Sequence, residues 1–144
     1  KNVRTSSKKH RSEQCFVYRT IKLSKKPRPR LAIDFDGVIH GYRLGFHDGS
    51  LYDVPVKGAK EALERLHKDW WLYIYTTRAK SRDGRRAIGA WLRRHGIPFD
   101  EVVASKPIAF AYIDDRAIRF ETWRQTLSDL QSLSRVDRQR LANR

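Results

Sequence analysis

The chain of 144 residues contains one cysteine, Cys15, and no methionine. A single cysteine can neither close an internal disulfide nor supply a multi-cysteine metal site, so folds that depend on either are excluded. This cysteine usage is typical of a reducing compartment, and we expect a cytoplasmic protein. Because even an initiator methionine is missing, the chain could be processed or could be a piece of a longer protein.

Long hydrophobic runs are also missing. The longest runs contain six residues, WWLYIY at 70–75 and IAFAYI at 108–113. A membrane-spanning helix needs about 20 consecutive apolar residues, so we expect no membrane partner. The N-terminus is basic and polar, without the apolar segment of a secretory signal.

Acidic residues are scarce relative to basic ones. The chain has 31 Lys and Arg against 16 Asp and Glu, a formal net charge of +15. Residues 1–30 hold 11 basic residues and the single acid Glu13, which leaves +10 there and +5 in the remaining 114 residues. Such a segment favours a polyanionic partner such as nucleic acid, although a solvated tail that keeps the protein soluble explains it equally well.

Composition changes abruptly near residue 30. The prolines of KKPRPR disfavour helix and indicate an extended linker, after which the chain becomes apolar. We therefore divide the chain into a basic N-terminal extension, 1–30, and a domain, 31–144. The extension is either disordered or contributes one edge strand from residues 15–23. The hydrophobic content of 40% is sufficient for one packed core.

Within the domain, strand-like apolar runs alternate with segments of helical periodicity. This alternation is typical of a layered α/β fold, and we expect a Rossmann-like three-layer sandwich with a mostly parallel central sheet. For the second helix Ser81 is the expected N-cap and Gly96 the stop, and for the first helix Asp53 and Pro55 mark the expected start. The predicted strands are 31–35, 70–76, 101–104 and 110–113, and the predicted helices are 56–68, 81–96 and 120–130.

The most informative stretch is LAIDFDGVIH, residues 31–40. It places two carboxylates, Asp34 and Asp36, at the end of a buried strand and just before Gly37. An aspartate at such a position is costly to keep unless chemistry uses it. His40 and His47, in the glycine-rich segment that follows, are expected at the surface, and its aromatic residues are expected to pack within the segment.

Polar residues directly follow each of the other predicted strands as well. In open α/β sheets, ligands bind outside the carboxyl ends of the strands, so these side chains are expected to converge. Trp70, Trp71, Tyr73 and Tyr75, which lie within a strand, are assigned instead to the core and the sheet faces. The residues at the strand ends are Asp34, Asp36, Thr76, Thr77, Arg78, Lys106, Asp114 and Asp115.

This set of side chains suits a phosphate ester. Close carboxylates repel one another unless a hard cation such as Mg²⁺ lies among them, and Asp34 with Asp114 forms the natural clamp. Lys106 and Thr76 can neutralise and hydrogen-bond phosphate oxygens, with Thr77 and Arg78 as further substrate-binding candidates. A carboxylate held in line with phosphorus can attack it and form an aspartyl-phosphate.

In order and spacing, these residues resemble the four motifs of the haloacid dehalogenase superfamily. The first motif matches DFDGV from Asp34, the second Thr76, the third Lys106, and the fourth the pair at 114 and 115. The resemblance implies that Asp34 is the nucleophile and Asp36 the general acid and base. It further implies Mg²⁺ held by Asp34, by the main-chain carbonyl of Asp36 and by Asp114, with Asp115 in support.

The acid at position 36 resembles the phosphatase branch of that superfamily. The spacing between the motifs leaves no room for a cap domain, and a capless site resembles an arrangement for large substrates or for oligomers that cover the site. The segment YIDDRAIRFETWRQ is also similar to the fourth-motif region of the phosphatase domain of a bacteriophage polynucleotide kinase-phosphatase. We therefore expect a phosphomonoester hydrolase, with a nucleic-acid terminal phosphate or nucleotide as the favoured substrate. A small-metabolite phosphatase and a catalytically idle nucleic-acid-binding or assembly module remain the alternatives, and a homo-oligomer is possible.

Overall fold

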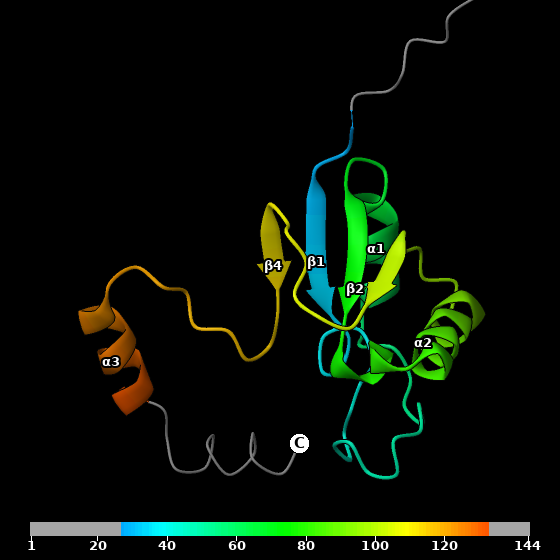
Figure 1. The fold of residues 1–144 in the computed structure, drawn as a ribbon, viewed down its shortest axis with the longest axis horizontal. Coiled ribbons are helices and arrows are strands. Elements are labelled where there is room, and N and C mark those ends of the chain that lie inside the picture. Colours follow the sequence, from blue (N-terminus) through cyan, green and yellow to red (C-terminus); the bar gives the residue numbers. More distant parts are fainter. Residues whose placement is uncertain (1–26, 133–144) are drawn as a thin grey trace, which may run out of the picture.

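The computed structural model of the chain describes residues 27–132. The expected strand at 15–23, Cys15 and most of the basic extension lie outside these residues, as does the basic C-terminal end. The described part is a mixed α/β fold with one sheet of four parallel strands in the order β3-β2-β1-β4, which confirms the expected fold class (Figure 1). Its strands are β1 (Arg30–Asp34), β2 (Trp71–Tyr75), β3 (Glu101–Val103) and β4 (Ala111–Ile113).

One face of the sheet forms the hydrophobic core. Residues alternate between the two faces along each strand, and the register pairs Leu31 with Leu72 and Ile33 with Ile74. These four aliphatic side chains are buried in one cluster with side chains of two helices, α1 (Ala59–Leu66) and α2 (Arg82–Arg94). Both helices therefore cover the same face.

The start of α2 follows the sequence prediction. Ser81 is its N-cap, and the hydroxyl of Ser81 accepts a hydrogen bond of 2.9 Å from the Gly84 N–H. A short 3-10 helix, η1 (Thr77–Lys80), precedes α2 and was not expected.

The predicted start of α1 was wrong. Gly58, in the left-handed conformation, is the N-cap, and the helix begins at Ala59 rather than at residue 56, so neither Asp53 nor Pro55 marks its entry. The Asp53 side chain is buried and is held by Arg43, whose Nη2 donates to it at 2.7 Å. Asp53 therefore closes the long loop before the helix instead of capping the helix.

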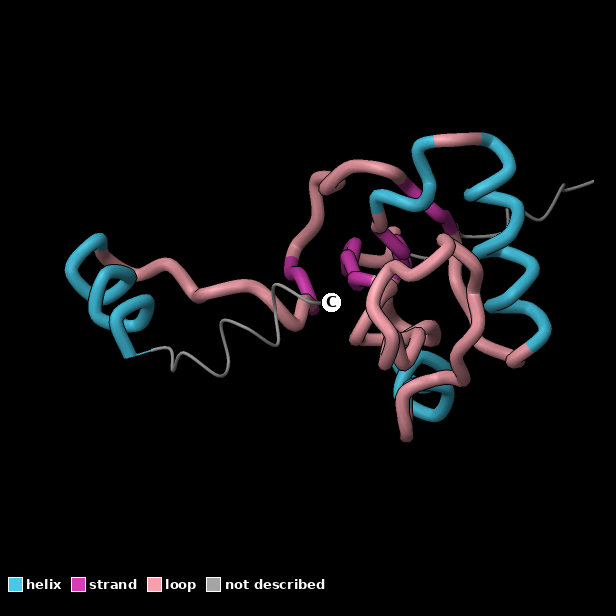
Figure 2. Tube along the Cα trace, turned by 90° about the horizontal axis from the view of Figure 1, so that it is seen from below, coloured by secondary structure: helices cyan, strands magenta, loops and turns pink. Residues whose placement is uncertain are grey.

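The last helix, α3 (Trp123–Ser132), stands apart from the sheet in both views (Figures 1 and 2), and none of its residues is buried. The second face of the sheet consequently has no helix of the described residues on it, and the expected third layer is not confirmed. Among residues 27–132, no helix has the length and hydrophobicity needed to cross a membrane.

Candidate active site

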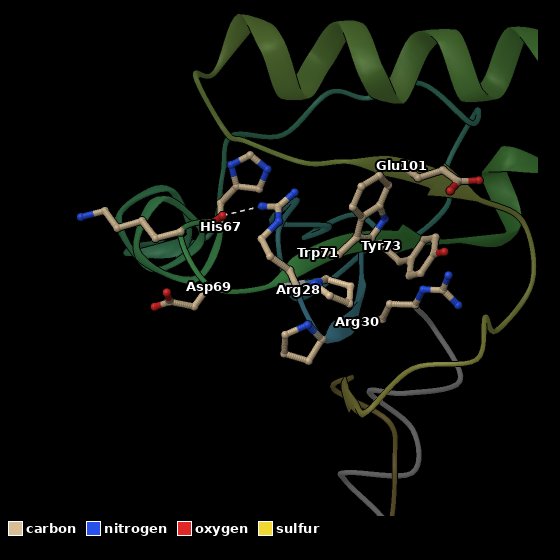
Figure 3. Close-up of a pocket in the computed structure, with 10 residues that line it drawn as sticks. Arg28, Arg30, His67, Asp69, Trp71, Tyr73 and Glu101 are labelled. Atoms are coloured by element: carbon tan, nitrogen blue, oxygen red, sulfur yellow. Dashed lines mark hydrogen bonds between the residues drawn. The ribbon is translucent and has the colours of Figure 1, made fainter. Parts of the chain in front are cut away.

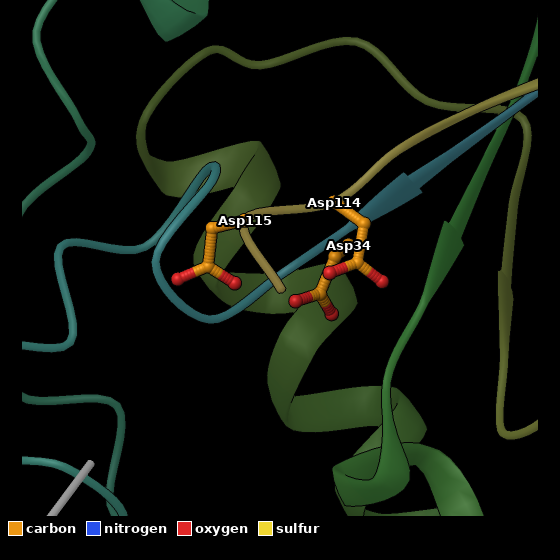
Figure 4. A group of neighbouring side chains, drawn as sticks. All are labelled: Asp34, Asp114 and Asp115. Carbon is orange, nitrogen blue, oxygen red and sulfur yellow. The ribbon is translucent and has the colours of Figure 1, made fainter. Parts of the chain in front are cut away.

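Three carboxylates meet at the carboxyl edge of the sheet. Asp34 is the last residue of β1, and Asp114 and Asp115 directly follow the neighbouring parallel strand β4, so the topology brings them to one place (Figure 4). One carboxylate oxygen from each residue lies within 4.8 Å of the other two. Asp34 Oδ1 also accepts a 2.8 Å hydrogen bond from the Phe35 N–H.

This crowding changes the acidity of Asp34. Burial is the main cause that raises its pKa to about 7, and repulsion by Asp114, Asp115 and Asp36 acts in the same direction. The hydrogen bond from the Phe35 N–H opposes the rise without cancelling it. In the absence of a cation, Asp34 therefore holds a proton during part of the time at neutral pH.

The donor set fits a hard divalent cation. Carboxylate oxygens are the ligands that Mg²⁺ prefers, and a positive charge among them would favour the ionised form of Asp34. The group comprises Asp34, Asp114 and Asp115 but not the carboxylate of Asp36. For Asp36 the resemblance implied only the main-chain carbonyl, so the same cation could be held without its side chain.

The Asp36 carboxylate is instead held by two other side chains. Arg78 Nε donates to Oδ2 at 2.7 Å, and His40 Nδ1 lies 3.0 Å from Oδ1. Because the Asp53 N–H donates to His40 Nε2 at 3.0 Å, Nδ1 must carry the imidazole proton and donate it to Asp36. The expectation that His40 lies at the surface was wrong, since its side chain is completely buried.

A pocket of about 370 Å³ opens beside the carboxylates. It brings together five of the eight residues expected at the strand ends, and Arg78, Asp114 and Asp115 are not among its lining residues. Arg78 nevertheless contacts the lining residues Asp36 and Thr76. The residues that line the pocket are Asp34, Asp36, Tyr42, Tyr75, Thr76, Thr77, Ala104, Lys106 and Arg116.

Two of the predicted pocket residues differ in how firmly they are held. Thr76 is buried at the end of β2, where its hydroxyl accepts a hydrogen bond from the Arg78 N–H at 3.3 Å. The ammonium group of Lys106 lies 4.1 Å from the centre of the Tyr112 ring and is exposed. Thr76 thus presents a buried hydroxyl, and Lys106 an exposed positive charge at the rim.

Sequence reasoning missed Tyr75 and Arg116. The Tyr75 hydroxyl donates to Asp114 Oδ2, and the Arg116 N–H donates to Oδ1 at 2.7 Å, so both orient this carboxylate. Burial is the main cause that raises the pKa of Tyr75, and the hydrogen bond to Asp114 adds to it, which keeps the hydroxyl protonated as a donor. Arg116 could have been found from its place two residues after Asp114, whereas Tyr75 resembles an ordinary strand residue.

No protein-family model, curated protein or solved structure matches the chain. Any assignment of chemistry therefore depends on the arrangement of these side chains.

Proposed function

We propose that this protein is a Mg²⁺-dependent phosphomonoester hydrolase of the haloacid dehalogenase type that works through an aspartyl-phosphate. The single observation that carries the proposal is the meeting of Asp34 with Asp114 and Asp115 beside a pocket that also contains Asp36 and Lys106. The parallel strand order β3-β2-β1-β4 is that of the first four strands of a Rossmann-like sheet, in which ligands bind where the strand order reverses, here between β1 and β4.

In the first step, an Asp34 oxygen attacks phosphorus while the bond from phosphorus to the ester oxygen breaks. The negative charge on the phosphoryl oxygens is balanced by Lys106 at the rim and by a hydrogen bond from the Thr76 hydroxyl. The leaving oxygen takes a proton from Asp36 in its acid form. Asp34 is suited to the role because it ends a strand and its backbone is held within the sheet.

In the second step, Asp36 takes a proton from water as the water oxygen attacks phosphorus. The bond between phosphorus and Asp34 breaks, inorganic phosphate leaves, and Asp34 returns as a carboxylate. Arg78 holds the Asp36 side chain in place through the 2.7 Å ion pair. His40 fixes the orientation of the same carboxylate.

Asp34, Asp114 and Asp115 would hold the Mg²⁺, with the main-chain carbonyl of Asp36 as the further ligand that the resemblance implies. When bound, the cation would supply positive charge for the phosphoryl oxygens and would keep Asp34 ionised.

The proposal is tested by Mg²⁺ titration of p-nitrophenyl phosphate hydrolysis. Wild type should show Mg²⁺-dependent turnover and Asp34→Asn should show none. Asp83→Asn is the matched control, because its side chain is 93% exposed on α2 and it should retain full activity. A phosphorylated species that hydroxylamine removes should be found only with Asp34 present. Equal rates in wild type and Asp34→Asn would refute the proposal.

A second measurement tests the role of Asp36. p-Nitrophenolate leaves without protonation, whereas an alkoxide does not, so in the first turnover, before hydrolysis of the aspartyl-phosphate contributes, Asp36→Asn should reduce the release of an alkyl alcohol far more than the release of p-nitrophenol. An equal loss for both leaving groups would contradict the role of Asp36 as the acid.

A further inference from the structure

The two faces of the sheet carry different chemistry. The face covered by α1 and α2 is aliphatic. The opposite face carries Trp71, Tyr73 and Tyr75, which are alternate residues of β2 and point away from the core cluster. Tyr112 on β4 belongs to the same face, because Ala32 of β1 lies in register with both Tyr73 and Tyr112. Trp71 is 38% exposed and Tyr112 is 39% exposed.

Cationic side chains accompany these rings. The guanidinium of Arg28 lies 5.5 Å from the Trp71 ring centre, that of Arg30 lies 6.0 Å from the Tyr73 ring, and Lys106 approaches Tyr112. A groove of about 1250 Å³ opens where Arg28, Arg30 and Trp71 meet (Figure 3). Its other charged residues include the exposed Lys68, Asp69 and Glu101.

This combination does not suit a covering helix. Packing a helix over the face would bury Arg30, Glu101 and Lys106, and removing unpaired charges from water costs several kcal/mol for each. Aromatic rings interleaved with Lys and Arg are instead what single-stranded nucleic acid requires, since bases stack on the rings and the cations attract the phosphates. Four-stranded sheets that recognise RNA stack two or three bases in this way.

The aromatic row also leads to the carboxylates. Tyr75 lies four positions after Trp71 on β2, about 13 Å along the strand. Tyr75 lies in register with Asp34 and donates to Asp114. If two bases of a single-stranded nucleic acid stack on Trp71 and Tyr73, the next nucleotide would therefore lie beside Asp34.

We propose that the open face of the sheet, formed by Trp71, Tyr73, Tyr75 and Tyr112, binds single-stranded nucleic acid and presents its phosphorylated end to the Asp34 pocket. The binding stands independently, and only the presentation of the phosphate rests on the proposed function.

The test is equilibrium binding of fluorescent oligonucleotides that lack a terminal phosphate, measured by anisotropy with the full chain. Trp71→Ala should weaken binding by about 5- to 150-fold, the range for one stacked base, and Trp71→Phe should recover most of it. Trp123→Ala is the matched control, because Trp123 is 71% exposed on α3 and should leave the affinity unchanged. The basic N-terminal extension is common to all variants, so its contribution cancels.

DNA and RNA oligonucleotides of one sequence form the two arms of the experiment, because only RNA offers a 2′-hydroxyl to the protein. A loss of affinity with Trp71→Ala in either arm supports the proposal and identifies the nucleic acid. Equal affinities for wild type, Trp71→Ala and Tyr112→Ala in both arms would overturn it. A change of molecular mass in the Trp71→Ala variant without any loss of affinity would also overturn it, because the face would then be a protein interface.

Hydrolysis of p-nitrophenyl phosphate separates this proposal from the proposed function. If the binding face and the phosphatase activity are both as proposed, Trp71→Ala lowers kcat/KM for a phosphorylated oligonucleotide. Its turnover of p-nitrophenyl phosphate then equals that of wild type. Wild type without any phosphatase activity, but with binding that depends on Trp71, would remove the enzyme proposal and keep the binding face.

Discussion

Arg78 and Asp36 form an ion pair that is almost fully enclosed. Their side chains are 5% and 16% exposed, and the 2.7 Å contact uses the Nε of Arg78. The guanidinium also donates to the Gly49 carbonyl at 2.6 Å and lies 4.7 Å from the Phe46 ring centre. Arg78, three positions after the end of β2, therefore holds both Asp36 and the loop around Gly49.

Replacing Arg78 by Ala should destabilise the protein and impair the site. Removal of one partner from a buried pair costs about 3–5 kcal/mol, because the remaining charge is left without compensation. Chemical denaturation should show this loss for Arg78→Ala but less than 0.5 kcal/mol for Arg82→Ala, whose side chain is exposed at the start of α2. Similar stabilities for both variants would show that the pair contributes little.

The raised pKa of Asp34 predicts an unusual dependence of stability on pH. Its pKa is about 7 in the folded protein, above the ordinary value near 4 of an unfolded chain, so the folded state binds the extra proton. Wild type without metal should therefore lose stability as the pH rises from about 4 to 7, and Asp34→Asn should not. Denaturation in EDTA at pH 5 and pH 8 measures the difference, with Asp83→Asn expected to behave as wild type.

Addition of Mg²⁺ at pH 8 should reverse this loss in wild type alone. A ligand present at 100 times its Kd stabilises a protein by about 2.7 kcal/mol, which raises Tm. Asp34→Asn lacks one carboxylate of the group and should show a much smaller rise. The same rise in both proteins would place the cation elsewhere.

Gly37 and Gly58 offer a matched pair of substitutions. Both have a positive φ, +88° and +84°, which costs an L-residue about 1–2 kcal/mol. A Cβ at Gly37 would lie 2.5 Å from Asp115 Oδ2, whereas a Cβ at Gly58 would meet no atom within 4 Å. Gly37→Ala should therefore weaken Mg²⁺ binding as well as stability, and Gly58→Ala should lower stability alone. Calorimetric titration with Mg²⁺ distinguishes the two effects.

Asp100 should contribute to stability at neutral pH and lose this contribution in acid. Although burial raises its pKa, the hydrogen bonds from the Leu72 N–H and Arg28, together with nearby His67, outweigh burial and hold the pKa below its ordinary value. The contribution is present above about pH 4 and disappears as the pH falls through the lowered value. Asp100→Asn should thus be less stable than wild type at pH 7 and equal to it in strong acid. A difference in stability between Asp100→Asn and wild type that persists in strong acid would refute this role of the Asp100 carboxylate.

The grouping of the polar residues at the strand ends was predictable from the sequence, because it depends only on the order of the strands and their parallel direction. Parallel strands bring their carboxyl ends to one edge, so reading the first polar residue after each apolar run was enough to group Asp34, Asp114 and Thr76. The start of α1 was not predictable in this way, because Asp53 has a typical capping side chain but its partner, Arg43, is selected by the fold of the loop. His40 was missed for a similar reason, since one of its two hydrogen-bond partners, the Asp53 N–H, is brought to it by the fold of the loop.

The sequence alone determined the alternation of strands and helices, the charge of the chain and the identity of the acids at the strand ends, because each depends on residue type and local spacing. The tertiary structure alone decided that Asp36 is held by Arg78 and His40, and that among residues 27–132 neither α3 nor another helix covers the aromatic face of the sheet. Such relationships depend on which surfaces meet in space, and periodicity along a chain specifies a face but not its partner.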